Sequence, residues 1–311
     1  MIAQVKRLAK GRTLPAQSVR VPGIVVDAIV VAPEQLQTTQ TVLLPEAAGH
    51  YRAPISELEL AAWGPEKVVA RRASQELRDG EAVNLGFGIS ALVPRILLEE
   101  GLDGSVTWVI EQGAVGGVPF LGFQFGCAQN PDALLASPDQ FTYLQGGGFD
   151  RALLSFLEVD AEGNVNVSRL NAKPHVTAGV GGFVDITSRA KRIVFSGYFT
   201  AGAQLAIVDG HVRIVREGKH QRFVPEVQHV TFSGRRAREL GQDVVFITER
   251  CVIRLLPEGL TVTEIAPGIS ITRDIVGQTS LDLRISPNLH QMDARLFQPE
   301  PMCLKLREGR S

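Results

Sequence analysis

The stretch 81-EAVNLGFGISALVPRILLEEGLDGSVTWVIE-111 decides the fold, because it holds a strand, a helix and a second strand in that order. Residues 81–90 are typical of a strand that ends in a glycine turn, and residues 91–102 of a helix. The β-branched and aromatic run 106–110 predicts a buried strand. A unit of this kind predicts two parallel strands joined by a right-handed crossover.

A second helix is expected just before this unit. Gly64 and Pro65 suit a helix start, and Val69, Ala73 and Leu77 recur at helical spacing. Gly80 suits a C-cap. We therefore predict a helix that begins at Pro65 and is capped at Gly80.

Strand signals continue to the end of the chain. Apolar runs predict strands within residues 151–160, 192–197, 244–256 and 260–268, and Asp209-Gly210 between two alternating runs predicts a β-hairpin. The pattern indicates an α/β fold with an open, mostly parallel sheet, flanking helices and antiparallel additions. Residues 1–62 hold short apolar strands separated by Pro and Gly and predict a strand-and-loop connector, so residues 63–311 are expected to form the main domain.

Composition excludes several classes of protein. The 311 residues are 44% hydrophobic and carry a formal net charge of -1, which argues against nucleic-acid and anionic-membrane partners. No stretch suggests a targeting signal or a transmembrane helix. The three cysteines form no CxxC pair, which favours a reducing cytoplasm over a disulfide framework or a zinc site, and Cys127 is expected to be a small buried hydrophobe. The six histidines lack HxxxH and HxH spacing, so we expect no metal site.

A single acid, Glu111, closes the strand 106–110 and is followed by glycines at 113, 116 and 117. In open α/β sheets ligands bind outside the carboxyl ends of the strands, which makes Glu111 a candidate site residue. Two glycine segments, one with Gly86 and Gly88 and the other with Gly181 and Gly182, would let backbone approach a ligand closely. The structural alternative is a turn acid held by nearby backbone N–H groups.

Two interpretations of the chemistry of Glu111 stay open from the sequence alone. Gly86, Gly88 and Ala91 match a G-x-G-x-x-A pattern, and Glu111 follows about twenty residues later, as in an NAD-binding dehydrogenase. That reading leaves the glycines after Glu111 unexplained. The other reading makes Glu111 a nucleophile toward an acyl thioester, because an ordinary Glu is ionised at neutral pH and needs no adjacent base. Backbone N–H groups of glycine loops suit the oxyanion that such attack develops.

The stretch 109-VIEQGAVGGVP-119 resembles the catalytic glutamate motif of the family I CoA-transferases. Further segments are similar to motifs of that family in the same order: 82-AVNLGFGIS-90, 146-GGGFDRALL-154, 159-VDAEGNVNVSRL-170 and 179-GVGGFVDI-186. The most similar type is the acetate/propionate (short-chain acyl) CoA-transferases. Departures from the family pattern are Gln112, Ser90 and the pair Ser155-Phe156.

The resemblance implies a ping-pong transfer of CoA from a short-chain acyl-CoA to a free carboxylic acid through a glutamyl-CoA thioester on Glu111. Coenzyme A would be a substrate, with no cofactor bound permanently. The resemblance also implies that Gly181 and Gly182 lie near the oxyanion and that Gly86, Gly88 and Gly113 belong to the same CoA-binding surface.

The resemblance covers the catalytic-glutamate, or beta, half of the family. Residues 1–62 resemble the end of an N-terminal half, so we expect a complementary half as a separate subunit, a homo-oligomer, or both. An inactive remnant of such an enzyme is the further alternative.

Overall fold

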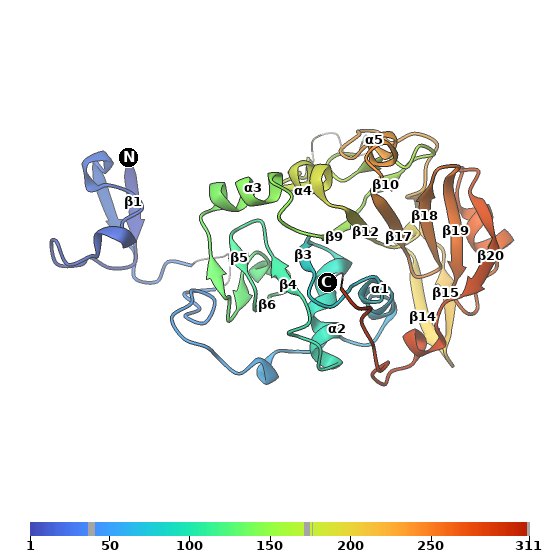
Figure 1. The fold of residues 1–311 in the computed structure, drawn as a ribbon, viewed down its shortest axis with the longest axis horizontal. Coiled ribbons are helices and arrows are strands. Elements are labelled where there is room, and N and C mark those ends of the chain that lie inside the picture. The colour runs from blue at the N-terminus through green and yellow to red at the C-terminus, as the bar shows by residue number, and fades with distance from the viewer. Residues whose placement is uncertain (37–40, 171–174, 176, 310–311) are drawn as a thin grey trace.

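A ten-stranded mixed sheet runs through the chain from residue 82 onward (Figure 1). The computed structural model describes residues 1–36, 41–170, 175 and 177–309. In spatial order the strands of this sheet are β20 (Arg284–Gln291), β19 (Gly259–Ile265), β18 (Cys251–Leu256), β17 (Asp243–Ile247), β12 (Arg192–Ser196), β9 (Arg151–Ser155), β3 (Ala82–Leu85), β4 (Thr107–Val109), β5 (Ala114–Val115) and β8 (Ala133–Leu134).

The central strands of the sheet, from β17 through β12, β9 and β3 to β4, are all parallel to their neighbours. Antiparallel pairings of β18 with β17 and of β5 with β4 extend this core on both sides. The predicted α/β class with antiparallel additions is therefore confirmed. The predicted parallel relation of the two strands flanking residues 86–106 is also confirmed, since β3 pairs with β4 in parallel register.

Helices cover both faces of this sheet, and alternating strand residues face two separate apolar cores. Leu153 and Val194 pack with α1 (Pro65–Ser74) and α2 (Val93–Glu99), whereas their neighbours Leu154 and Phe195 pack on the other face. That second face carries α3 (Ser137–Gln145), α4 (Phe183–Arg189) and α5 (Gly234–Glu239), which lie above the sheet in Figure 1. The period-2 alternation of buried residues thus explains why both faces of the sheet need helices.

Four short antiparallel sheets accompany the main one. They are β6 (Val118–Pro119) with β7 (Ala128–Gln129), β10 (Glu158–Val159) with β11 (Val165–Asn166), β13 (Thr200–Ala201) with β16 (His220–Gln221), and β14 (Gln204–Val208) with β15 (His211–Arg216). The predicted hairpin is confirmed: Val208 pairs with His211, and both turn residues, Asp209 and Gly210, have positive φ (49° and 74°).

The predicted end of the first helix is wrong. Helix α1 begins at Pro65 as expected but ends at Ser74, not at Gly80. Beyond it the amide of Leu77 bonds to the carbonyl of Ser74, and the side chain of Leu77 is fully buried. The amides of Asp79 and Gly80 then donate to Arg307 and Ser105, so partners distant in sequence replace the helical ones.

The N-terminal residues form a small unit apart from the main sheet. Strands β1 (Ile2–Val5) and β2 (Ala28–Val31) pair in parallel, and Figure 1 shows them standing away from the rest of the chain. No described residue before Ala61 is buried, and many of their large apolar side chains are exposed, Ile24 by 96% and Ile2 by 73%. This segment therefore has no apolar core of its own.

Truncation of a core phenylalanine tests the second core. The ring of Phe246 stacks on that of Phe195 with centroids 5.2 Å apart, and both side chains are fully buried. We expect Phe246→Ala to lower the free energy of unfolding by about 3–5 kcal/mol in urea denaturation followed by circular dichroism, because it removes buried area and leaves a cavity. Val215→Ala, at a side chain 62% exposed, is the control and should change it by less than about 0.5 kcal/mol. Equal effects of the two substitutions would contradict this core.

Candidate active site

Glu111 lies where strand β4 ends and the chain turns back into β5. The amide of Gly113 donates to the carbonyl of Ile110 at 2.9 Å, which closes a tight turn around Glu111. Gly113 has a φ of +124°, and a Cβ there would lie 2.1 Å from the carbonyl oxygen of Leu135. This glycine therefore permits the turn, and the structure places it behind Glu111 rather than in the wall of the cavity described below.

The glycine segment before α4 meets the carboxylate of Glu111. The backbone N–H of Gly182 donates to Oε2 of Glu111 at 2.8 Å, while Oε1 makes no hydrogen bond with the described residues. A Cβ on Gly181 would lie 2.8 Å from Oε1, and one on Gly182 would lie 2.5 Å from Oε2. Only glycine at these two positions lets the carboxylate sit against the backbone.

Burial raises the pKa of Glu111 above the ordinary range of a carboxyl group. The hydrogen bond from Gly182 opposes this shift, and the negative charge of Asp185 adds to it. The amide of Gln145 donates to the Asp185 carboxylate at 2.9 Å. The carboxylate of Glu111 is therefore partly desolvated, which suits a nucleophile that loses its charge when it forms a covalent bond.

A cavity of about 410 Å³ opens beside Glu111. Its wall combines the strand ends of β3 and β9 with the segment 178–183, and its lining is mainly apolar: Leu85, Phe87, Phe125, Leu154, Phe156, Leu157, Val167, Ala178, Val180, Phe183 and Ile186. The polar lining comes from Gln112, Ser155 and the backbone of glycines 86, 179 and 181. The structure thus brings Glu111, Gly86, Gly181 and Gly182 together.

Gly88 serves the turn that follows β3. Its φ is +106°, and a Cβ there would lie 2.1 Å from Oγ of Ser155. That hydroxyl donates to the carbonyl of Phe87 at 2.6 Å. Ser155, which departs from the family pattern, therefore holds the glycine turn in place.

Sequence reasoning missed the aromatic edge of the cavity. Phe87 is 66% exposed, and its ring meets that of Phe125 edge to face, with centroids 5.6 Å apart. Phe87 stands between the two glycines of the turn, and this local signal could have indicated a side chain displayed at the strand end. Phe125 lies 38 positions further on, and no local pattern connects the two.

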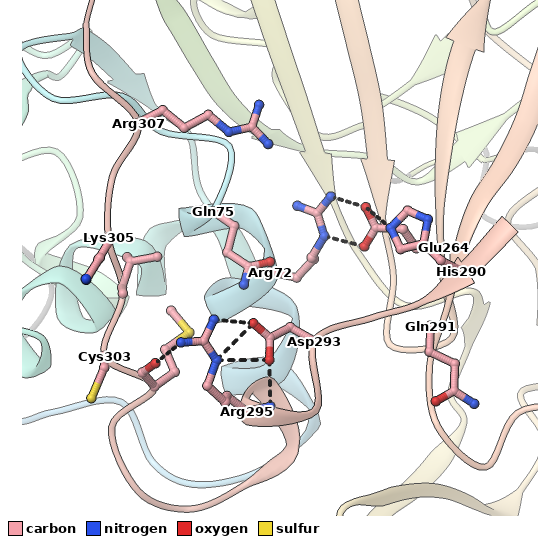
Figure 2. Close-up of a pocket in the computed structure, with 12 residues that line it drawn as sticks. Arg72, Gln75, Glu264, His290, Gln291, Asp293, Arg295, Cys303, Lys305 and Arg307 are labelled. Carbon is pink, nitrogen blue, oxygen red and sulfur yellow. Dashed lines mark hydrogen bonds and ion pairs between the residues drawn. The ribbon is translucent and has the colours of Figure 1, made fainter. Parts of the chain in front are cut away.

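A second, wider cavity lies elsewhere, between α1, the strands β19 and β20, and the C-terminal segment (Figure 2). Its volume is about 790 Å³. Arg72 forms two hydrogen bonds with Glu264, at 2.8 and 2.6 Å, and Arg295 is bonded to Asp293. These two ion pairs hold parts of the wall together, and the lining of the groove also includes Lys305 and Arg307.

Other chemistry finds little support in the part of the chain that the structure describes. No three histidine, cysteine or acidic side chains in it are grouped closely enough to hold a metal ion. Its helices are all too short or too polar to cross a bilayer. The thiol of Cys127 is exposed rather than buried, which corrects the sequence expectation, because its loop lies at the surface beside residues 41–48.

Comparisons with known proteins show what the chain as a whole is similar to. No family model matches the chain. The chain is similar to a caffeate CoA-transferase of Acetobacterium woodii, with 39% identity over 303 residues that make up 96% of this chain and 58% of that protein. It is also similar to the acetate CoA-transferase subunit beta of Escherichia coli K12, with 27% identity over 65% of this chain and 86% of that subunit.

Among solved structures, the fold superposes on an acyl-CoA transferase (YdiF) of Escherichia coli O157:H7 described as a thioester complex with CoA. The TM-score is 0.88 at 38% identity, over 99% of this chain and 57% of that one. The chain therefore spans little more than half the length of the long relatives that it matches. None of these comparisons favours the NAD-binding dehydrogenase that the glycine spacing had left open.

Removal of the buried charge tests the environment of Glu111. The raised pKa means that the folded state binds this proton more tightly than the unfolded state, so stability falls as pH rises from the ordinary carboxyl value through the folded value. Glu111→Gln removes this loss. We expect Glu111→Gln to be more stable than the wild type at pH 7, with the difference shrinking as pH falls below the folded pKa.

Urea denaturation at several pH values between 4 and 7.5 measures this difference. Glu226→Gln serves as the control, because Glu226 is an exposed glutamate outside the cavity. A pH-independent difference for Glu111→Gln would contradict the assigned burial of its charge.

Proposed function

Because this chain belongs to the family I CoA-transferases, we propose that it supplies the catalytic-glutamate half of an enzyme that moves CoA from a short-chain acyl-CoA to a free carboxylic acid. The observation that supports this best is the partly buried carboxylate of Glu111, held at 2.8 Å by the N–H of Gly182 at the wall of a mainly apolar cavity. Residues 63–311 would form the catalytic domain, with residues 1–62 as a connector.

In the first step of the proposed reaction, Oε1 of Glu111 attacks the thioester carbonyl of the acyl-CoA. The C–S bond breaks, the CoA thiolate leaves and an acyl-glutamyl anhydride remains on the enzyme. The thiolate then attacks the glutamyl carbonyl and releases the acyl group as a carboxylate, which leaves a glutamyl-CoA thioester. The second acid reverses these steps, so that no water and no redox partner is consumed.

Two backbone features suit this chemistry. Attack of the thiolate on the glutamyl carbonyl places negative charge on Oε2, and the N–H of Gly182 already points at this oxygen. The absence of Cβ atoms at Gly181 and Gly182 leaves room for a tetrahedral carbon next to the backbone. Gly86, which also lines the cavity, gives a substrate close access to the backbone.

A complementary polypeptide is part of the proposal. The chain matches 58% of a long relative but 86% of a beta subunit, a name that implies a second subunit. The exposed apolar side chains of residues 1–36 offer it a contact surface. A homo-oligomer of the completed enzyme is compatible with the same surface.

The three free cysteines fit a cytoplasmic location.

Intact mass spectrometry tests the covalent step. We expect incubation with acetyl-CoA or propionyl-CoA, together with the complementary half, to add one CoA through a thioester, so the mass rises by that of CoA less one water. Glu111→Ala should abolish the adduct, because it removes the only proposed nucleophile. Glu226→Ala, at the exposed glutamate outside the cavity, is the matched control and should retain it.

Persistence of the adduct in Glu111→Ala would overturn the assignment of the nucleophile. Absence of any adduct in the wild type, with the complementary half present, would favour an inactive remnant over an enzyme.

Co-purification tests the partner. We expect a tagged form of this chain to retain the polypeptide that corresponds to the missing part of the long relatives when the two are co-expressed. Ile24→Asp together with Ile29→Asp should weaken this association by about tenfold or more, because charges would be buried in an apolar contact. Val215→Asp, exposed on β15, is the control. Retention that is unaffected by the Ile substitutions would place the contact elsewhere.

A further inference from the structure

We propose that Asn84 and Gln140 are positioning residues that fix the backbone leading into Glu111. This inference rests on the proposed function of Glu111 and adds residues that the reaction requires without their touching the substrate. Both side chains are fully buried, and both donate a hydrogen bond to a carbonyl just before the glutamate.

Asn84 acts from the neighbouring strand. It lies opposite Val109 in the parallel pairing of β3 with β4, and its Nδ2 donates to the carbonyl of Val109 at 2.9 Å. Val109 is the last residue of β4 in this pairing, and on the other side the amide of Gly86 continues the pairing of β3 with β9 by donating to Leu153 at 2.7 Å. The side chain of Asn84 thus adds a hydrogen bond at the end of the β3–β4 pairing, two residues before Glu111.

Gln140 acts from the helix above the sheet. It lies in α3, and its Nε2 donates to the carbonyl of Ile110 at 3.0 Å. That carbonyl already accepts the amide of Gly113 at 2.9 Å. The carbonyls of the two residues before Glu111 are therefore held from two separate elements, 25 and 30 positions away in sequence.

Hydrogen-bond satisfaction alone does not account for these amides. Oδ1 of Asn84 and Oε1 of Gln140 are buried and have no hydrogen-bond partner in the structure. Asn84 leaves one oxygen unpaired although Val109 already lies in the backbone pairing of β3 with β4. Gln140 leaves an oxygen unpaired although Ile110 already had a donor. Both amides instead restrain the positions of the Val109 and Ile110 carbonyls.

That restraint matters for the distance between Glu111 and the oxyanion donor. Glu111 has a long side chain, and its carboxylate must stay close to the N–H of Gly182, which belongs to a segment 71 positions away. A shift of the strand end would move the nucleophile relative to this donor. Small misplacements of a reacting group lower rates steeply.

The test uses two near-isosteric variants without a donor, Asn84→Leu and Gln140→Met, and the matched control Gln242→Met. Nε2 of Gln242 also donates to backbone carbonyls, those of Thr187 and Ala190, but away from the cavity. The first readout is the rate of CoA adduct formation on Glu111 against acyl-CoA concentration, with the complementary half present. We expect the saturating rate to fall about 10- to 100-fold while the half-saturating concentration stays within about twofold.

The second readout is independent of activity. We expect hydrogen exchange of the Gly182 amide, resolved by NMR, to accelerate in both variants as it does in Glu111→Ala, and to stay unchanged in Gln242→Met. Thermal unfolding reports whether each variant is folded. If Asn84→Leu does not fold, Gln140→Met alone tests the positioning role.

If the Gly182 amide exchanges at the wild-type rate in folded variants, the positioning role is overturned. It is also overturned if the variants unfold at a lower temperature but keep the wild-type saturating rate of adduct formation. If the wild type forms no CoA adduct, the proposed function fails, and the exchange measurement still decides whether these amides position Glu111.

Discussion

One hydrogen bond, from the N–H of Gly182 to Oε2 of Glu111, determines how the site is built. It joins the end of β4 to the segment before α4, and both must reach the same edge of the sheet. Parallel central strands make this possible, because their carboxyl ends gather at one edge. The contact also fixes two residue types, since a Cβ at Gly181 or Gly182 would collide with a carboxylate oxygen.

The surroundings of this bond are unfavourable for stability, and the rest of the fold compensates. Burial raises the pKa of Glu111, and two amide oxygens stay unpaired nearby. Phe156 and Phe183, by contrast, belong both to the wall of the cavity and to the aromatic core below it. The same core that stabilises the sheet therefore gives the cavity a rigid wall, which is what a preorganised site needs.

Features set by local chemistry could be predicted from the sequence, and features set by distant contacts could not. Glu111 at a strand end, the turn at Gly86 and the hairpin at Asp209 follow from short-range patterns, and the structure has them. The end of α1 was misplaced because a short local turn follows Ser74 and the amides of Asp79 and Gly80 then donate to carbonyls distant in sequence.

Glycines were the hardest residues to interpret. Gly88 and Gly113 have the spacing of ligand-binding glycines, yet glycine is also needed at both positions for the turn itself. A Cβ would collide with Ser155 at Gly88 and with Leu135 at Gly113. Asn84 lies in a segment that resembles a family motif and Gln140 in none, but the role of either amide is recognisable only from the carbonyl that it meets.

The lining of the cavity also bears on how an acyl-CoA would be held. Its described lining contains the carboxylate of Glu111, aromatic rings and apolar side chains. Contacts with the nucleotide part of CoA, far from the reacting carbonyl, increase the rate when they are formed in the transition state. Under the proposed function, the apolar lining would hold the acyl group of the thioester beside Glu111, and contacts with the rest of CoA would add to this binding.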